Sequence, residues 1–506
     1  QETFASFIED AIKNSRLDKR LASFDLKELG DYIKPERDEL LDFMGLDMLH
    51  DRYFIQSEGR GRRLEVPQTF WMRIAMGLAI SEKKDKEKYA KEFYDVLSTL
   101  RYVPSTPTLF HSGTSKPQLS SCFLNTVEDD LKHIFKVYLD NALMSKYSGG
   151  IATDWTNIRA TGSLIKTINI HSQGVIPFLK IMNDTTVAIS RSGKRKGATC
   201  AYLETWHLDI EDFLELRKNT GDERRRTHDM NTANWVPDLF MERVSADEPW
   251  TLFSPEETPD LHHLYGAAFK KRYEEYEKMA DEGKINLFRR VPAIQLWRKM
   301  LTMLFETGHP WITFKDACNV RSPQDHVGVV HNSNLCTEIT LNNSPEETAV
   351  CNLGSLALPK FVEMDSQGIP CFNFEKLREY TRILTRNLDI VIDKNFYPTP
   401  ETRNSNMKHR PIGIGIQGLA DVFAMLRLPW SSTEAQNLNR EIFENIYYAA
   451  VEASIHRAHE LRTYNHSIHD EVPLSFPSFE GSPTSKGKLQ FDLWNDTPKQ
   501  TPYLNW

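Results

Sequence analysis

The chain has 506 residues, of which 40% are hydrophobic, 11% aromatic and 26% charged, as in an ordinary globular protein with a sizeable core. Its net charge of -8 argues against a protein devoted to gripping nucleic acid, which normally has a basic face, but leaves nucleotide binding open. No apolar run reaches the ~20 residues of a membrane span, and the N-terminus lacks a signal-peptide layout. We therefore expect a cytoplasmic protein without membrane contact.

Six cysteines are too few for a disulfide scaffold in a chain of this size. No two of them have the two-residue spacing of a zinc knuckle or a thioredoxin-like motif. We expect no metal site, and most of the cysteines should be reduced and buried.

Residues 1–118 are predicted to form a mainly helical N-terminal domain. Residues 69–80 are apolar on most faces, which suits a buried helix. Residues 53–68 are predicted to form a short hairpin. Pro104 and Pro107 mark the end of the helical region.

Residues 119–465 alternate short apolar or β-branched runs with longer helical stretches, a pattern typical of an α/β fold with parallel strands. The candidate strands are GVIPFL (174–179), TCAYL (199–203), PWITF (310–314), EITL (338–341) and RPIGIGI (410–416). The candidate helices include 210–219 and 293–306. Residues 466–506, rich in Pro, Ser, Thr and Asn, are predicted to be an irregular connector.

The stretch NSNLCTEI, beginning at residue 332, concentrates groups that could carry chemistry. If it is extended, Asn334, Cys336 and Glu338 project from one side, because side chains alternate along a strand. A carboxylate can take a proton from a substrate hydroxyl, and an amide can hold an oxygen. From spacing alone, an ordinary strand with three unremarkable residues is the better interpretation.

This stretch resembles the catalytic finger loop of ribonucleotide reductase large subunits, where an Asn-Leu-Cys-x-Glu run carries the radical cysteine. Further segments resemble the same family, in family order: QLSSCFLN, WHLDIEDFLELRKN, WTLFSPEETPDL, VCNLGS and RPIGIGIQGLADVF. The likeness extends from about residue 5 to about residue 465. It implies a ten-stranded α/β barrel of the ribonucleotide reductase type, with its last strands missing from this chain, and an N-terminal helical domain.

The resemblance assigns a role to each catalytic residue. Cys336, as a thiyl radical, would take the 3′ hydrogen of a ribonucleotide, and Glu338 would take the proton of the 3′ hydroxyl. Asn334 would orient the substrate. Cys122 would protonate the departing 2′ hydroxyl and end in a disulfide with Cys351. The last two cysteines are 229 positions apart, so only the fold can bring their Cα atoms to the ~4.4–6.8 Å of a disulfide.

The resemblance places substrate binding at Thr106, Ser121, Ser148 and Gly149. The residues themselves allow this, because the first two lie in hydroxyl-rich turns. The other two lie in a glycine turn, whose backbone N–H groups can approach a phosphate. Ordinary turns are the alternative.

The resemblance implies that a deoxynucleotide or ATP effector is held by Asp129 and Arg159, which match residues of the family's specificity site. The basic, glycine-containing segment 190–198 matches the mobile loop that reports the effector to the active site, and its charge and flexibility suit that task. The cationic residues expected to serve there are Arg191, Lys194, Arg195 and Lys196. Without the resemblance, a basic segment such as 190–198 is usually a solvated loop.

Two further patterns are interpreted as structural. Gly413, Gly415 and Gly418 match a dinucleotide-binding motif, but no acidic residue follows at the required distance, so we predict a strand running into a tightly packed helix. Glu204 and His207 form one Glu-x-x-His pair, whereas a di-metal carboxylate bundle needs two such pairs.

Two helical patterns near the end are interpreted in the same way. Tyr447 and Tyr448 are adjacent, like the family's radical-relay tyrosines, but that pair lies beyond the point where this chain ends. We therefore expect them to fill core space. His456 and His459 suit a polar helix face at least as well as a metal site.

The resemblance also predicts partners. A separate metal-containing small subunit would generate the radical, this chain would bind no cofactor itself, and thioredoxin or glutaredoxin would act as reductant. We expect a homodimer built on helices near the effector site, and diphosphate substrates. The family's N-terminal cone, C-terminal phosphate loop, relay tyrosines and reducing tail have no counterpart here. A truncated subunit, or a second chain supplying the C-terminal part, is therefore expected.

Three alternatives stay open. An adenosylcobalamin-dependent reductase shares the barrel and cysteines but typically has Pro-Cys-Gly-Glu where this chain has Leu-Cys-Thr-Glu. A non-catalytic nucleotide-binding fragment could keep the fold, although the joint presence of all five catalytic residues argues against it. The third alternative is a general α/β metabolic enzyme.

Overall fold

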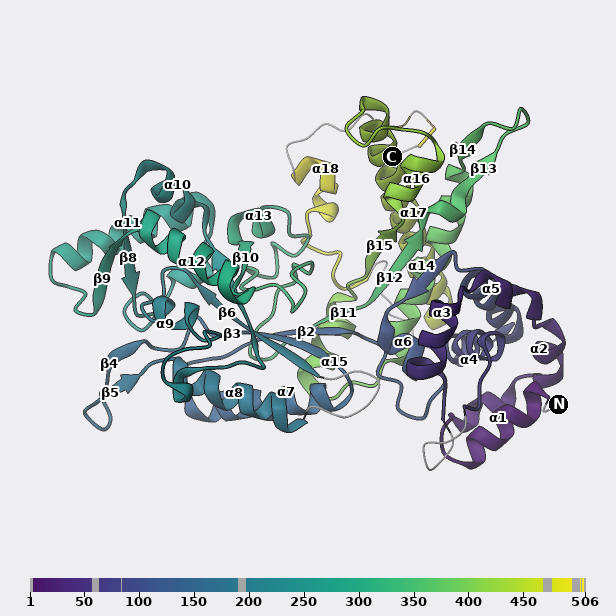
Figure 1. Ribbon diagram of the computed structural model, residues 1–506, viewed down its shortest axis with the longest axis horizontal. Coiled ribbons are helices and arrows are strands. Elements are labelled where there is room, and N and C mark those ends of the chain that lie inside the picture. The colour runs from purple at the N-terminus through teal and green to yellow at the C-terminus, as the bar shows by residue number, and fades with distance from the viewer. Residues whose placement is uncertain are drawn as a thin grey trace.

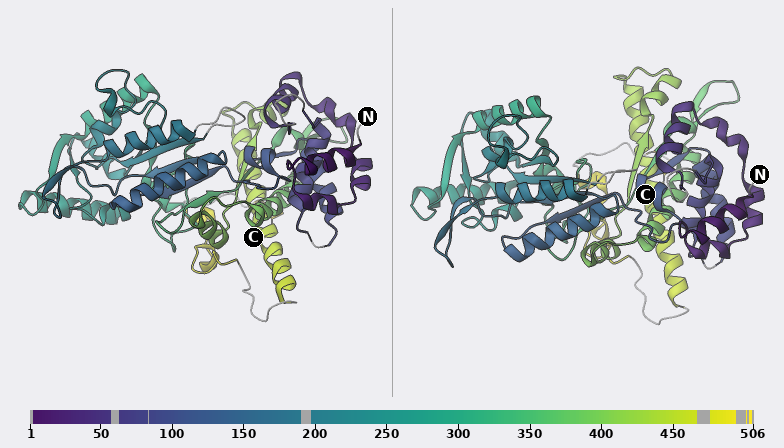
Figure 2. Two further views of the ribbon diagram at one scale, coloured as in Figure 1. Left: turned by 90° about the horizontal axis from the view of Figure 1, so that it is seen from below. Right: turned by 60° about the horizontal axis from the view of Figure 1, so that its bottom comes forward.

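The computed structural model describes residues 3–56, 63–82, 84–189, 197–466, 476–493, 501 and 503–504. The molecule is elongated, with the N-terminal helices at one end and the largest sheet extending towards the other (Figure 1). The same arrangement is seen from two other directions in Figure 2.

The N-terminal part is helical, as predicted. Its helices are α1 (Phe4–Lys13), α2 (Leu26–Tyr32), α3 (Phe43–Met48), α4 (Pro67–Ala79), α5 (Lys86–Ser98) and α6 (Thr106–His111). Helix α4 is buried along nearly its whole length, which confirms the prediction drawn from its apolar residues on most faces. An antiparallel bridge between Gln56 and Arg63 confirms the stem of the predicted hairpin, whose turn lies outside the described residues.

A six-stranded sheet forms the centre of the molecule, in the order β10-β7-β6-β3-β2-β11. Its strands are β2 (Cys122–Thr126), β3 (Gly150–Asp154), β6 (Ala198–Glu204), β7 (Asn231–Val236), β10 (Trp311–Phe314) and β11 (Ala349–Cys351). Strands β10 to β2 are parallel to their neighbours, and β11 is antiparallel to β2. This confirms the predicted α/β architecture with parallel strands.

Helices connect and cover the parallel strands, so the strands are largely buried. These helices are α7 (Leu131–Lys146), α8 (Ile176–Ile189), α9 (Ile210–Leu214), α10 (Asp238–Ala246), α11 (Gly266–Asp281), α12 (Ala293–Thr307) and α13 (Lys315–Val320). Two hairpins extend from this half, β4 (Thr161–Ile165) with β5 (Ile170–Gln173) and β8 (Pro249–Phe253) with β9 (Phe288–Pro292). Helices α7 and α8 lie side by side below the sheet in Figure 1.

A second, three-stranded sheet has the order β1-β12-β15. Its strands are β1 (Tyr102–Pro104), β12 (Leu353–Ala357) and β15 (Gly413–Gln417). Around it lie the hairpin β13 (Val362–Met364) and β14 (Pro370–Phe372), and helices α14 (Phe374–Lys394), α15 (Pro400–His409), α16 (Leu419–Met425), α17 (Thr433–His466) and α18 (Gln490–Leu493). The N-terminal helices share one hydrophobic core with β12 and α14. In the described residues, β11 leads directly into β12, but the two sheets do not close into a barrel.

Two strand predictions were wrong. Residues 174–179 lead into helix α8, because Pro177 has a backbone suited to the first turn of a helix. Residues 338–341 form no strand; the backbone N–H of Ile339 donates to the side chain of Asn334 rather than to a neighbouring strand. In contrast, Gly418, at φ +76°, follows β15 directly and caps α16, as predicted for the glycine motif.

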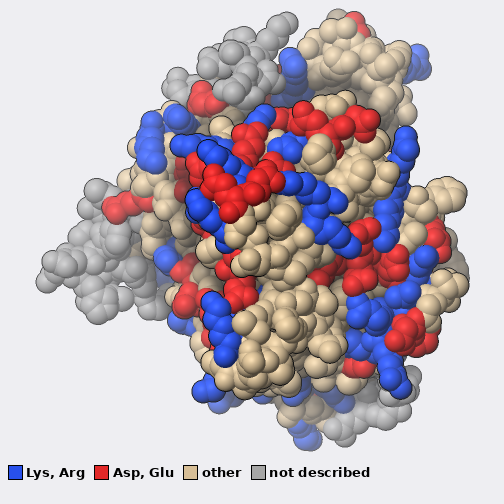
Figure 3. Space-filling view, turned by 90° about the vertical axis from the view of Figure 1, so that its left-hand side faces the viewer, with Lys and Arg blue, Asp and Glu red and all other residues tan. Residues whose placement is uncertain are grey.

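The end of the molecule that carries β8, β9 and α11 has acidic and basic side chains intermixed rather than a single basic patch (Figure 3). Many of them are paired, as in Arg243–Glu277, Arg272–Asp260 and Arg290–Asp281. Among the described helices, none is both long and apolar enough to span a membrane.

A buried ion pair joins α4 to the segment before it, and the same arginine also links α4 to the end of α6; we predict that this group matters for stability. The Arg73 Nε lies 2.6 Å from the Glu65 carboxylate, both side chains are fully buried, and Arg73 also donates to the carbonyls of Leu109 and Ser112. Replacing Arg73 with Met leaves the carboxylate buried and unpaired, so the free energy of unfolding should fall by about 3–5 kcal/mol. Urea unfolding measures this. Exposed Arg403→Met is the control, and equal midpoints for the two variants would contradict the prediction.

Candidate functional site

The antiparallel pairing of β2 with β11 places two of the predicted catalytic cysteines opposite each other. Cys122, the first residue of β2, is the register partner of Cys351, the last residue of β11. Residues opposite each other in antiparallel strands have Cα atoms about 4.5–5.5 Å apart, within the range of a disulfide. Both side chains are buried free thiols. The fold therefore satisfies the distance requirement that the resemblance imposed on this pair.

The segment that carries Cys336 is a turn, so the expectation of an extended strand was wrong. The N–H of Thr337 donates to the carbonyl of Asn334, and Thr337 has φ +71°. Leu335, within the turn, packs against an apolar cluster of the sheet that includes Tyr202 and Trp235. The turn buries Asn334 and exposes Cys336, because the alternation of a strand no longer applies.

Asn334 is fully buried and held on both sides. The Tyr202 hydroxyl donates to its backbone carbonyl at 2.8 Å, and its side-chain oxygen accepts from the N–H of Ile339 at 3.0 Å. Its Nδ2 has no hydrogen-bond partner among the protein's N and O atoms, although the side chain reaches the Cys122 thiol. A buried amide N–H without an oxygen acceptor is costly, so this group is disposed to bind an oxygen atom of a ligand.

The two facing thiols differ in acidity. A hydrogen bond from Cys351, supported by Ser121 and Asn334 and opposed by burial, lowers the pKa of Cys122 to about 7. Burial, together with the hydrogen bond to Cys122, raises the pKa of Cys351 well above its usual value. Cys122 is therefore the better proton donor of the pair, and the thiol that forms a thiolate first.

Glu338 and Cys336 complete the group of five predicted catalytic residues. Both are exposed, and the Glu338 carboxylate is close enough to raise the pKa of Cys122 and Cys351 by its charge. Cys336 in turn acts on buried Cys200, whose pKa is raised mainly by burial and further by Cys336. The structure thus brings Cys122, Cys351, Asn334 and Glu338 around one small volume, with Cys336 in the same turn.

One of the four predicted substrate-binding residues, Ser121, lies beside this volume. The Ser121 hydroxyl is 3.4 Å from the Cys351 sulfur. Thr106 begins α6 next to Ser105, whose N–H donates to the carbonyl of Leu353, two residues beyond Cys351. The Thr106 hydroxyl lies 3.5 Å from the Tyr53 hydroxyl, so Ser121 is the candidate whose hydroxyl lies next to the cysteine pair.

The glycine turn differs from its predicted role. The N–H groups of Ser148, Gly149 and Gly150 donate to the carbonyls of Ser145, Met144 and Ser121, so none of them is available to a phosphate in this conformation. Gly149 is instead required by packing, because a Cβ there would lie 2.6 Å from the Phe123 ring.

The predicted effector residues are partly described. Arg159 donates to Asp129 at 2.7 Å, and both side chains are about one quarter exposed. Asp129 lies just before α7, so the ion pair connects the start of that helix to the segment before β4. Arg191, Lys194, Arg195 and Lys196 lie outside the described residues.

The residues whose patterns were interpreted as structural make contacts within the protein or lie on its surface. His207 binds the carbonyl of Ile158 at 2.7 Å, and the Tyr447 ring packs edge-on against Phe491. His456 is exposed on α17. Within the described ranges, no three His, Cys, Asp or Glu residues are grouped so that they could hold a metal ion.

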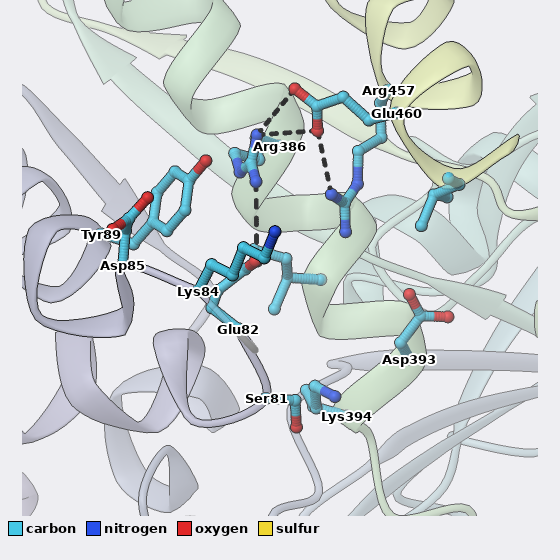
Figure 4. Close-up of a pocket in the computed structure, with 12 residues that line it drawn as sticks. Ser81, Glu82, Lys84, Asp85, Tyr89, Arg386, Asp393, Lys394, Arg457 and Glu460 are labelled. Carbon is cyan, nitrogen blue, oxygen red and sulfur yellow. Dashed lines mark hydrogen bonds and ion pairs between the residues drawn. The ribbon is translucent and has the colours of Figure 1, made fainter. Parts of the chain in front are cut away.

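A cavity of about 700 Å³ lies elsewhere, between residues 81–89, α14 and α17 (Figure 4). Arg386 is central to it; it pairs with Glu460 and Glu82 and lies over the Tyr89 ring. The cavity contains none of the predicted site residues, and its charges largely neutralise one another.

Sequence reasoning missed the residues that hold the Cys336 turn in place. Tyr202 and His331 carry no motif, and their partners Asn334 and His262 are distant in the sequence. The only available signal was the position of Tyr202 in a predicted strand, two residues from Cys200 and on the same face.

Comparisons with known proteins identify the family of the chain. The family model for the ribonucleotide reductase barrel domain matches residues 120–506, and that for the ribonucleotide reductase all-alpha domain matches residues 39–117. The chain is 54% identical to the ribonucleoside-diphosphate reductase subunit alpha of Chlamydia pneumoniae, over 94% of this chain and 44% of that protein. It is 44% identical to the large subunit from Arabidopsis thaliana, over 92% of this chain and 56% of that protein.

A third relative is the ribonucleoside-diphosphate reductase large chain 2 of Saccharomyces cerevisiae, 43% identical over 98% of this chain and 54% of that protein. The chain thus spans about half the length of the curated relatives it matches. The expected fold class is confirmed, since the two matched models are an all-alpha domain followed by a barrel domain. This chain belongs to the ribonucleotide reductase family and, within it, to the large or alpha subunits.

Proposed function

We propose that the protein to which this chain belongs reduces ribonucleoside diphosphates to 2′-deoxyribonucleotides by thiyl-radical chemistry. The observation that carries the proposal is the register of β2 and β11, which sets Cys122 opposite Cys351 beside Asn334 and Glu338. The relatives are named ribonucleoside-diphosphate reductases, which supports diphosphates as substrates.

The proposed reaction begins at Cys336. Its thiyl radical takes the 3′ hydrogen of the ribose, which leaves a carbon radical at C3′ and restores the thiol. Glu338 takes the proton of the 3′ hydroxyl, and the side chain of Asn334 holds a substrate oxygen through its unpartnered Nδ2. Ser121 supplies a hydroxyl group for the substrate next to the cysteine pair, and Thr106 supplies a second from the start of α6.

The cysteine pair supplies the two electrons. Cys122 gives its proton to the 2′ hydroxyl, which departs as water, and its lowered pKa suits it to that role. Oxidation of Cys122 and Cys351 to a disulfide then places hydrogen at C2′, and Cys336 returns hydrogen to C3′. The balance is one C2′–OH and two thiols converted into one C2′–H, one water and one disulfide. A dithiol protein such as thioredoxin or glutaredoxin would reduce the disulfide.

The radical on Cys336 would come from a separate metal-containing small subunit. The relatives' names, subunit alpha and large subunit, support a partner of this kind. Turnover with adenosylcobalamin and no second protein would contradict this choice.

Effector binding is proposed at the Asp129–Arg159 pair together with the segment that contains Arg191, Lys194, Arg195 and Lys196. Because Asp129 immediately precedes α7, an effector there could act on a dimer interface formed by that helix. Helix α7 has an exposed apolar stripe, with Leu131 61%, Phe135 53% and Leu139 59% exposed at four-residue spacing. Exposed Ile181 and Val187 lie on the adjacent α8.

We predict that mild oxidation of the reduced protein joins Cys122 to Cys351. Because the thiolate is the attacking species and the pKa of Cys122 is about 7, the rate should rise between about pH 6 and 8. Peptide mapping by mass spectrometry identifies the bond. Cys351→Ser should abolish it and exposed Cys371→Ser should not; a bond between any other cysteines would contradict the pairing.

Cys336→Ser should abolish reduction in the complete subunit assayed with its small subunit, by on the order of a thousandfold or more, since a hydroxyl cannot form the required radical. Nucleotide affinity should stay within about twofold, because the substitution is nearly isosteric. Deoxynucleotide formation and equilibrium binding measure the two effects. Cys371→Ser is the matched control. Full activity of Cys336→Ser would support a non-catalytic role for the chain.

Phe135→Asp should weaken the dimer about thirtyfold or more, as expected for a charge placed at the centre of an apolar interface. Sedimentation velocity over a concentration series measures the association. Phe305→Asp is the control, because Phe305 is also highly exposed but lies on α12. If both substitutions leave association unchanged, α7 is not the interface.

A further inference from the structure

A fully buried group of charges lies at the carboxyl ends of the central strands. Asp154 is the last residue of β3, Glu204 is the last residue of β6, and Lys315 directly follows β10. All three side chains are completely buried. Because these strands are parallel, their carboxyl ends meet at one edge of the sheet.

His262 connects the two carboxylates. Its Nε2 lies 2.7 Å from Asp154 and its Nδ1 lies 2.5 Å from Glu204. Ionised carboxylates only accept hydrogen bonds, so both ring nitrogens must donate and the ring is an imidazolium. Burial opposes the charge, but the two carboxylates outweigh it and raise the pKa of His262 to about 9. Lys315 donates to Glu204 at 2.8 Å, so two positive and two negative charges balance.

The ring of His331 lies on this imidazolium. The two ring centroids are 4.7 Å apart with planes inclined by 38°, and a nitrogen of His263 lies 2.9 Å from the His331 Nε2. Burial and the charge of His262 lower the pKa of His331 well below its usual value, so the ring is neutral. The hydrogen bonds of His262 fix the position of its charged ring, and the attraction between this cation and the neutral His331 ring in turn fixes His331.

His331 is the first residue of the segment that leads to the Cys336 turn. Beyond it, Asn332 accepts from the side chain of Asn343 at 2.7 Å, and Asn334 accepts from Tyr202. Contacts with a defined direction thus hold the segment from His331, which we call its base, to Asn334 at the start of the turn.

We propose that His262 and His331 are positioning residues for the reaction. The imidazolium, fixed between Asp154 and Glu204, supports the His331 ring and thereby sets where Asn334 and Cys336 project. The proposal rests on the proposed function, because it concerns the same turn. Among the described residues, the two histidines contact the buried charges and each other, so both act through the backbone that they anchor.

The test uses the complete subunit with its small subunit at saturating substrate. His331→Ala removes the supported ring, so kcat should fall by about tenfold or more through misplacement of the turn, while KM changes by less than about twofold. His331→Phe keeps a ring over the imidazolium and should retain kcat within about threefold. Glu204→Gln, remote from the turn, should reproduce the kcat loss. His456→Ala, on exposed α17, is the control.

Equal kcat for His331→Ala and the wild type would overturn the proposal, as would equal losses for His331→Ala and His331→Phe. Thermal unfolding reveals a variant that does not fold. If His331→Ala is that variant, Glu204→Gln takes its place, and equal kcat for Glu204→Gln and the wild type would overturn the proposal. Cys336→Ser measured in parallel separates the two hypotheses. An inactive wild type refutes the proposed function, whereas an active wild type, inactive Cys336→Ser and normal His331→Ala refute only the positioning role.

Discussion

The pairing of β11 with β2 is the constraint on which the site depends. It is the one antiparallel neighbour in an otherwise parallel six-stranded sheet, and it joins that sheet to the second sheet through the continuous run from β11 to β12. A shift by one residue would turn every side chain of β11 to the other face. Cys351 would then no longer face Cys122, and Ser121 would lose its contact with the sulfur. The register thus determines whether the two thiols can exchange a proton or form a bond.

The sequence was sufficient to predict the fold class, because short segments such as TCAYL and PWITF contain β-branched and aromatic residues and alternate with helical stretches. Family resemblance supplied the chemical groups. The sequence was insufficient where a local interaction outweighed the apolar pattern that had suggested a strand. Pro177 turned an apolar run into the start of α8, and the Asn334 side chain took the N–H that would have extended residues 338–341. The approach of Cys122 to Cys351 was supplied by family resemblance alone, since no local pattern encodes contact between such distant residues.

The glycine turn shows why residue type alone does not define a binding role. A glycine before a strand suits a phosphate cradle and a tight packing contact equally well. Here the packing contact is realised: Gly149 has Phe123 against it, and the N–H groups of the turn are bound to protein carbonyls. The groups left to bind a ligand near the cysteines are therefore the Ser121 hydroxyl and the Asn334 amide, whose Nδ2 lacks an oxygen acceptor.

The charged group beneath His331 needs a physical reason, because buried ion pairs seldom add stability over apolar residues of the same volume. Two kinds of contact hold the segment that carries Cys336: apolar contacts at Leu335 and charged hydrogen bonds at His262. Leu335 packs on an apolar cluster that tolerates small rotations, since dispersion contacts have no preferred direction. At the base, both nitrogens of His262 are bound to carboxylates, so its ring cannot turn without breaking a charged hydrogen bond. The directional bonds at His262 and His331 therefore fix where the segment begins, whereas the apolar contacts of Leu335 leave the exposed Cys336 thiol free to adjust its position.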